Sequence, residues 1–106
     1  PGAAAAATYI NFSANGTILG GGVYAADTTT ASGGAFAVLL PTVPSHGQSL
    51  EFQDPLLVWH INAFTVNGNG KTITCLGSVD TTVVANTRGL FFKLQWSAAD
   101  NTWRMS

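Results

Sequence analysis

Short runs of β-forming residues, each ended by a turn signal, constrain the fold of this chain most strongly. Glycine, asparagine, proline or aspartate separates the runs, at a spacing of about 8–12 residues. No window of about ten or more residues shows the 3.6-residue apolar period of an amphipathic helix. The pattern predicts an all-β fold, a single small antiparallel β-sandwich or barrel-like domain.

Within these runs, apolar residues alternate with polar or small ones, so that one face of each strand is expected to be buried. The predicted core residues are Phe36, Val38, Leu40, Leu50, Phe52, Phe64, Val66, Leu90, Phe92, Leu94 and Trp96.

Three turn signals predict hairpins. Asn15-Gly16 would join strands at 8–12 and 17–19, and the Asn-Gly-Asn-Gly stretch at 67–70 would join strands at 60–67 and 72–75. A turn at 98–101 would close a C-terminal hairpin ending at 102–105. The order of the strands cannot be read from these signals.

The length of 106 residues suits one modest hydrophobic core and therefore one domain. Residues 1–7 are predicted to be an extended N-terminal arm, because a helix built on five alanines is too short to be stable alone. Residues 8–106 are predicted to be a single β domain. The opening Pro1-Gly2 suits a chain that has lost its initiator methionine, so we expect a complete small product.

Charged residues make up only 8% of the chain, and the net charge is −1. Four cationic side chains cannot neutralise a nucleic acid backbone, so no nucleic acid partner is predicted. No apolar run is long enough to span a membrane as a helix, and no membrane partner is predicted. A small soluble domain normally carries more surface charge. We therefore expect copies of the chain to cover part of the surface.

No enzyme activity or cofactor is predicted. Gly70-Lys71-Thr72 matches the end of a phosphate-binding loop, but Thr65 stands where that loop requires its first glycine. Ser45 and His46 are adjacent, with Asp54 nearby in sequence, yet no G-x-S-x-G motif is present. Glu51 and Asp54 are the only close pair of carboxylates.

No metal site is predicted either. His46, His60 and Cys75 lack a second ligand at metal-binding spacing. Asn67, Asn69 and Asp80 could offer oxygen atoms to calcium, but the acidic density of a calcium loop is missing.

The tryptophans are the best candidates for binding a ligand, because their ring faces can stack on sugars. Trp96 shares the apolar face of its strand, which favours a core position. Trp103 would cover an open end of the core. Trp59 follows the Asp54-Pro55 break and is expected to be the most exposed of the three. Trp59 and Trp103 are therefore the predicted glycan-binding residues.

The order of several short motifs resembles a β module common in the virion proteins of tailed bacteriophages. The motifs are AFAVLLP at 35–41, GQSLEFQD at 47–54, NAFTVN at 62–67 with NGKTI at 69–73, LQW at 94–96 and NTWR at 101–104. The resemblance covers 35–106. The chain departs from the pattern at Cys75-Leu76, where small or acidic residues are usual, and in its longer final turn at 96–100.

The resemblance implies a virion structural protein without catalysis, usually a homotrimer. Because no shaft repeats are present, the expected role is a capsid decoration (cement) protein that binds the major capsid protein on the head exterior. The first alternative is a tail-fibre or receptor-binding module that contacts host surface polysaccharide. The second is a stand-alone carbohydrate-binding module.

Overall fold

The computed structural model describes residues 9–18 and 22–106, which form strands and one short 3₁₀ turn. The elements are β1 (Tyr9–Phe12), β2 (Gly16–Thr17), β3 (Gly22–Ala26), η1 (Thr30–Ser32), β4 (Phe36–Leu39), β5 (Ser49–Gln53), β6 (Phe64–Asn67), β7 (Thr72–Cys75), β8 (Ser78–Asp80), β9 (Thr82–Ala85), β10 (Phe91–Ser97) and β11 (Thr102–Met105). The predicted arm at 1–7 lies outside the described residues, as does residue 19.

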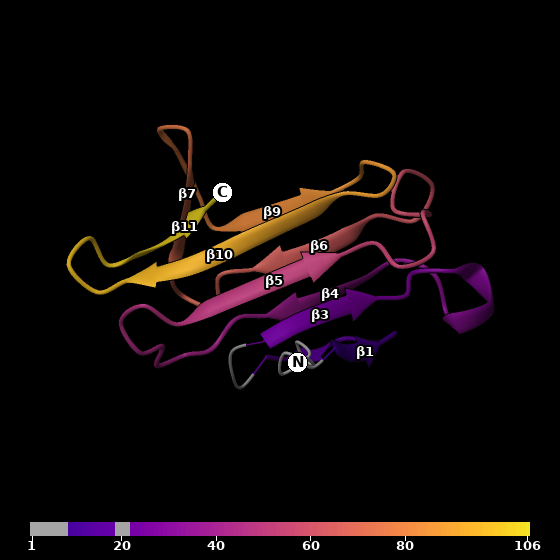
Figure 1. Ribbon diagram of the computed structural model, residues 1–106, viewed down its shortest axis with the longest axis horizontal. Coiled ribbons are helices and arrows are strands. Elements are labelled where there is room, and N and C mark those ends of the chain that lie inside the picture. The colour runs from indigo at the N-terminus through magenta and orange to yellow at the C-terminus, as the bar shows by residue number, and fades with distance from the viewer. Residues whose placement is uncertain (1–8, 19–21) are drawn as a thin grey trace, which may run out of the picture.

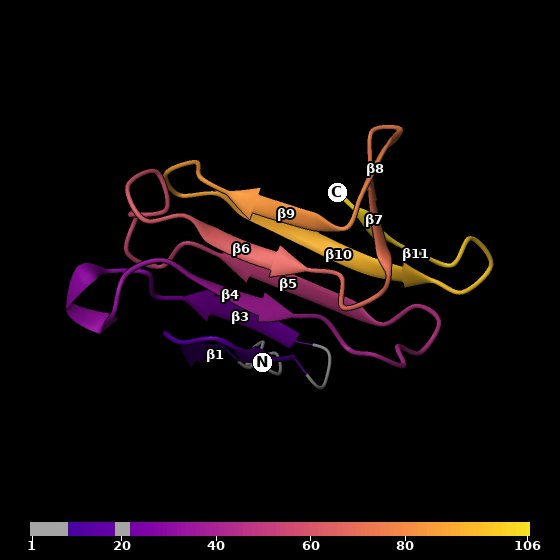
Figure 2. The same ribbon diagram turned by 180° about the vertical axis from the view of Figure 1, so that it is seen from behind.

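The strands form two sheets that pack face to face. The larger has the order β1-β3-β5-β10-β11-β7-β8, and the smaller has the order β2-β4-β6-β9. Both views show β4 against β3, β6 against β5 and β9 against β10 (Figures 1 and 2). The prediction of an all-β sandwich is confirmed.

The predicted antiparallel pairing is wrong for much of the molecule, because the sheets are mixed. The strand pairs β1–β3, β3–β5, β2–β4, β4–β6 and β7–β11 are parallel. For the first four of these pairs the physical reason is the path of the chain, which crosses to the opposite sheet after each strand from β1 to β5. Each crossing reverses the direction of the chain, so two crossings restore it. The strand that re-enters a sheet therefore runs parallel to the previous strand of that sheet.

Two of the three predicted hairpins are wrong for the same reason. The chain turns after β1 and after β6, but the next strand joins the other sheet. The stretch at 67–70 still forms a turn, as its asparagines and glycines predict, since Asn69 and Gly70 have positive φ angles of 55° and 89°. The C-terminal hairpin is confirmed, with Trp96 opposite Trp103.

Strands β8 and β9 were not predicted from the sequence. The β-branched run at 82–84 is the signal that could have indicated β9.

Between the sheets lies an aromatic core. The ring centroid of Phe52 lies 5.5 Å from that of Phe64 and 5.3 Å from that of Phe92. Trp59 stacks on Phe64 at 5.1 Å. Burying one such side chain stabilises a fold by roughly 1.5–3 kcal/mol. The predicted inward faces are confirmed, since Phe52, Phe64, Leu40, Leu50, Val66 and Leu94 are fully buried.

The Asp54 carboxylate fixes the loop that carries Trp59. Its oxygens accept hydrogen bonds from the backbone N–H groups of Val58, Trp59 and Gly89, each at 3.0 Å. Asp54 is itself 6% exposed. One buried carboxylate therefore joins two loops at the same end of the sandwich.

A second carboxylate, Asp27, organises the turn between β3 and β4. It accepts hydrogen bonds from the Thr29 hydroxyl at 2.7 Å, the Thr29 N–H at 2.9 Å and the Ser32 hydroxyl at 2.8 Å. The bonds from the Thr29 hydroxyl and N–H, with a smaller contribution from Ser32, hold the pKa of Asp27 below its ordinary value of 3.8.

The depressed pKa of Asp27 predicts a stability contribution that depends on pH. It is present above the unfolded-state pKa of 3.8 and lost as pH falls through the lower folded-state value. We expect Asp27→Asn to unfold more easily than the wild type at pH 6, and this difference to shrink toward pH 2. Urea unfolding across that range measures it. A difference that stays constant with pH would contradict the assignment.

Candidate functional site

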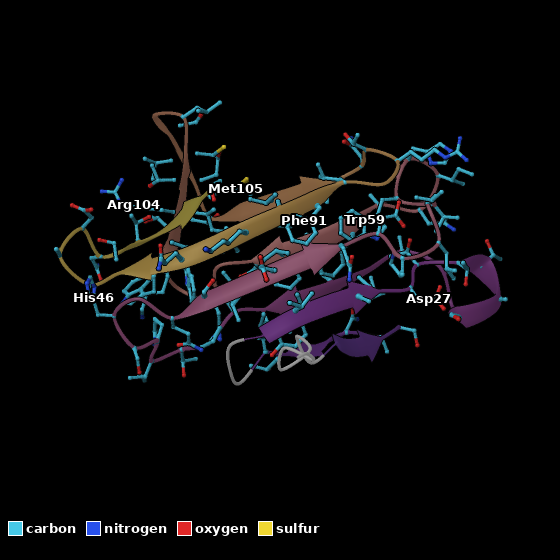
Figure 3. All side chains as sticks on the ribbon, in the orientation of Figure 1. Asp27, His46, Trp59, Phe91, Arg104 and Met105 are labelled. Atoms are coloured by element: carbon cyan, nitrogen blue, oxygen red, sulfur yellow. The ribbon has the colours of Figure 1, made fainter. Side chains whose placement is uncertain are left out.

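The prediction that Trp59 is the most exposed tryptophan is wrong. The Trp59 side chain is fully buried, and its Nε1 donates a hydrogen bond to the Ala26 carbonyl oxygen at 3.0 Å. The cause is the Asp54 carboxylate, which folds the loop back so that the indole covers Phe64. Figure 3 labels Trp59 toward the right-hand end of the sandwich.

Trp103 is also fully buried, packed edge-on against Trp96 at 5.5 Å. Neither Trp59 nor Trp103 offers a free ring face, so the predicted glycan-stacking role of both residues is corrected. Both rings belong to the core, because a flat apolar ring is stabilised more by packing between sheets than by solvent.

The two buried indoles differ in whether their Nε1 donates a hydrogen bond. Replacing each tryptophan by phenylalanine is therefore expected to lower the stability of the protein by different amounts. Trp103 Nε1 has no hydrogen-bond partner within residues 9–18 and 22–106, whereas Trp59 Nε1 has one. We expect Trp59→Phe to destabilise the protein more than Trp103→Phe, by about 1 kcal/mol, because only the first change loses a hydrogen bond. Thermal unfolding of both variants measures this difference, and equal costs would contradict the assignment.

The residues considered for nucleophilic catalysis are not assembled. His46 Nδ1 accepts a hydrogen bond from the Ala98 N–H at 3.0 Å. Both oxygens of Asp54 are occupied by backbone N–H groups, those of Val58 and Trp59 in the loop that follows it and that of Gly89 in a second loop. His46 and Arg104 lie at the opposite end of the molecule from Trp59 (Figure 3). Glu51 stands opposite Lys93 on the neighbouring strand.

The asparagines considered for calcium have structural partners. Asn67 Oδ1 accepts from the Asn69 N–H at 2.8 Å, and Asn69 Nδ2 donates to the Leu40 carbonyl at 3.0 Å. They hold the crossing between the sheets. Across the part of the chain that the structure describes, no three His, Cys, Asp or Glu residues come close enough to hold a metal ion.

A polar hollow of about 230 Å³ lies beside His46, with Gln95 and Arg104 among its lining residues. Arg104 is paired with Asp100, which lowers the pKa of that carboxyl below 3.8. The guanidinium charge is therefore already neutralised. The hollow offers hydrogen bonds but no uncompensated charge to attract an ionic ligand.

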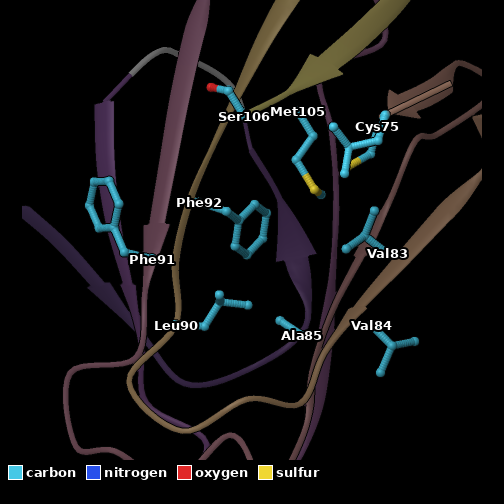
Figure 4. A pocket seen from close by; sticks show the side chains of 10 residues that line it. Cys75, Val83, Val84, Ala85, Leu90, Phe91, Phe92, Met105 and Ser106 are labelled. Carbon is cyan, nitrogen blue, oxygen red and sulfur yellow. The ribbon is translucent and has the colours of Figure 1, made fainter. Parts of the chain in front are cut away.

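A larger, apolar pocket opens at the edge of the sandwich, with a volume of about 350 Å³. Its lining residues are Cys75, Leu76, Val83, Val84, Ala85, Leu90, Phe91, Phe92, Met105 and Ser106. Figure 4 shows Met105, Phe92 and Val83 around one space, whereas Phe91 lies on the other side of its strand. No lining side chain is an acid, a histidine or a cation.

The pocket exists because the two sheets differ in width. The smaller sheet ends at β9, which lies against β10, whereas the larger continues through β11, β7 and β8 (Figures 1 and 2). The inner faces beyond β10 therefore lack a full covering layer. The resulting gap is lined by Cys75 and Met105 on one side and by Val83 on the other.

Exposed apolar side chains also stand on the hairpin and the strands that carry this pocket. Leu76 is 102% exposed, Val79 60%, Val84 56% and Phe91 54%. We call these four residues the apolar rim. Leu76 and Val84 are continuous with the apolar lining of the pocket, and a contiguous exposed apolar patch typically marks an interaction surface. Sequence reasoning did not find this surface; the departure at Cys75-Leu76 was its only signal.

No protein-family model and no curated protein matches this chain.

None of the described segments forms a helix of the length and apolar character needed to cross a membrane.

Proposed function

We propose that this protein is a structural protein of a bacteriophage virion, a homotrimer that decorates the capsid exterior and stabilises the head by binding the major capsid protein. The observation that carries the proposal is the open apolar pocket, with the exposed Leu76 and Val84 among its lining residues, on a chain with only 8% charged residues. A surface of this kind is stabilised when another subunit covers it.

The resemblance to phage virion modules supports the same role. Its motifs fall on β4, β5, β6, β7, β10 and β11, so they span both sheets of the sandwich. The geometry supports binding in preference to catalysis. Asp54 and His46 engage backbone N–H groups, and the two hollows described above hold no pair of facing carboxylates.

The two glycan-binding alternatives lose the residues on which they depended. Both relied on Trp59 or Trp103 as a stacking platform, and both rings are inside the core. A sugar-binding role would need another aromatic surface. Among the aromatic side chains of residues 13–18 and 22–106, Phe91 is the exposed one, and it lies on the outer side of its strand.

A rebinding experiment tests the proposed function. Phage heads stripped of their outer proteins are mixed with the purified protein and sedimented. We expect the protein to sediment with the heads and to raise the temperature at which they release DNA. An unrelated β-sandwich of similar mass is the control. Failure to sediment at micromolar concentrations, with the protein folded, would overturn the decoration role.

A further inference from the structure

Leu76 is placed where a leucine is unfavourable for the isolated chain. Cys75 pairs with Ser78, so Leu76 and Gly77 alone form the turn of the β7–β8 hairpin. Their φ angles are 50° and 85°. Two-residue turns with two positive φ angles favour Asn-Gly, and the left-handed conformation is sterically unfavourable for a leucine.

The Leu76 side chain also gains nothing from burial in the monomer, since it is 102% exposed. The β7–β8 hairpin stands out from the body of the sandwich in both views (Figures 1 and 2). All three residues of β8 are exposed. The hairpin thus carries a strained, exposed leucine at its tip, beside the pocket that Leu76 partly lines.

We propose that the apolar pocket of one chain receives the β7–β8 hairpin tip, with Leu76, of a second copy. The pocket and the tip match in chemistry: the lining carries no charged side chain, and the inserted group is aliphatic. The volume of about 350 Å³ is ample, because cavities of roughly 150 Å³ already accept benzene. Insertion would remove Leu76 from water and cover the apolar lining of the pocket.

The second copy is the occupant because the chain itself supplies both halves of the contact. The tip and the pocket lie side by side, so a copy that inserts its tip brings its own pocket close to the next tip. Such a contact can close as a ring of three. The low charge of the chain leaves little electrostatic repulsion between copies. This inference rests on the self-association in the proposed function and assigns its surface.

Leu76→Asn is the decisive variant, because it separates assembly from folding. Asparagine tolerates the left-handed conformation, so the folded monomer is expected to be at least as stable as the wild type. The variant loses the inserted side chain, and we expect its subunit dissociation constant to rise at least about tenfold. Sedimentation equilibrium measures the constant, and circular dichroism checks the fold.

Leu57→Asn is the matched control. Leu57 also has a positive φ angle, 60°, and is 47% exposed, but it does not line the pocket. The same substitution there should leave the dissociation constant unchanged. A second pair, Val84→Lys at the pocket and Val43→Lys in the β4–β5 connection, tests the surface without changing the turn. Only Val84→Lys is expected to weaken assembly.

The outcomes distinguish this inference from the proposed function. If the wild type assembles and both Leu76→Asn and Val84→Lys assemble equally well, the pocket is not the interface, while self-association stands. If the wild type is monomeric at all concentrations, both fail. A small apolar molecule that native mass spectrometry finds bound to the wild-type chain would assign the pocket to a ligand and overturn the inference.

Discussion

Asp54→Ala is expected to lower the free energy of unfolding by about 4 kcal/mol, because three backbone N–H groups would lose a charged acceptor. Hydrogen bonds to a charged group contribute roughly 1.5–3 kcal/mol each, and water can replace only some of them at a site that is 6% exposed. Since small domains are stable by only about 5–15 kcal/mol, the variant should be close to unfolding at room temperature. Urea unfolding followed by circular dichroism measures the change.

Asp80→Ala is the matched control for Asp54. It removes a carboxylate that is exposed on the edge strand β8, and we expect little change in the unfolding midpoint. If Asp54→Ala were as mild as Asp80→Ala, the carboxylate would not be organising the loops at 55–63 and 86–90.

Trp59→Ala is expected to cost about 4 kcal/mol. The substitution empties a fully buried site that stacks on Phe64, and it removes the hydrogen bond to the Ala26 carbonyl. Replacing a buried tryptophan by alanine typically destabilises a protein by about 3–5 kcal/mol. Thermal unfolding followed by circular dichroism measures the loss.

Trp59→Phe is the control for this prediction, because it keeps an aromatic ring at the site. It should retain more than half of the stability that Trp59→Ala loses. An alanine variant with unchanged stability and reduced binding to a polysaccharide would instead restore Trp59 as an exposed sugar platform and contradict the burial described above.

The inward faces of the strands could be predicted because β structure alternates with a period of two. The local alternation of apolar and polar residues is therefore enough to predict the burial of Leu50 and Phe52, and likewise of Phe64 and Val66. The pairing of the strands could not be predicted. The turn at 67–70 has the same Asn-Gly chemistry whether its strands pair or separate into two sheets, and only contacts distant in sequence decide between these.

The error at Trp59 has a similar origin. Its loop has no periodicity, so its burial depends on the Asp54 carboxylate and on Gly89, 35 positions further along the chain. A local signal was present, since an aspartate followed by proline is a typical capping sequence that turns the chain back on the side chain. The pocket could hardly be predicted from the sequence, because it results from the unequal widths of the two sheets. Only Leu76, before the turn glycine, stood out.

The solution mass of the wild-type protein tests the central claim most directly. Sedimentation equilibrium should give a species of three times the chain mass of 11.0 kDa, which dissociates on dilution. A mass of 11.0 kDa at every concentration up to about 1 mM would contradict the account, because the apolar rim would then remain uncovered in the folded protein.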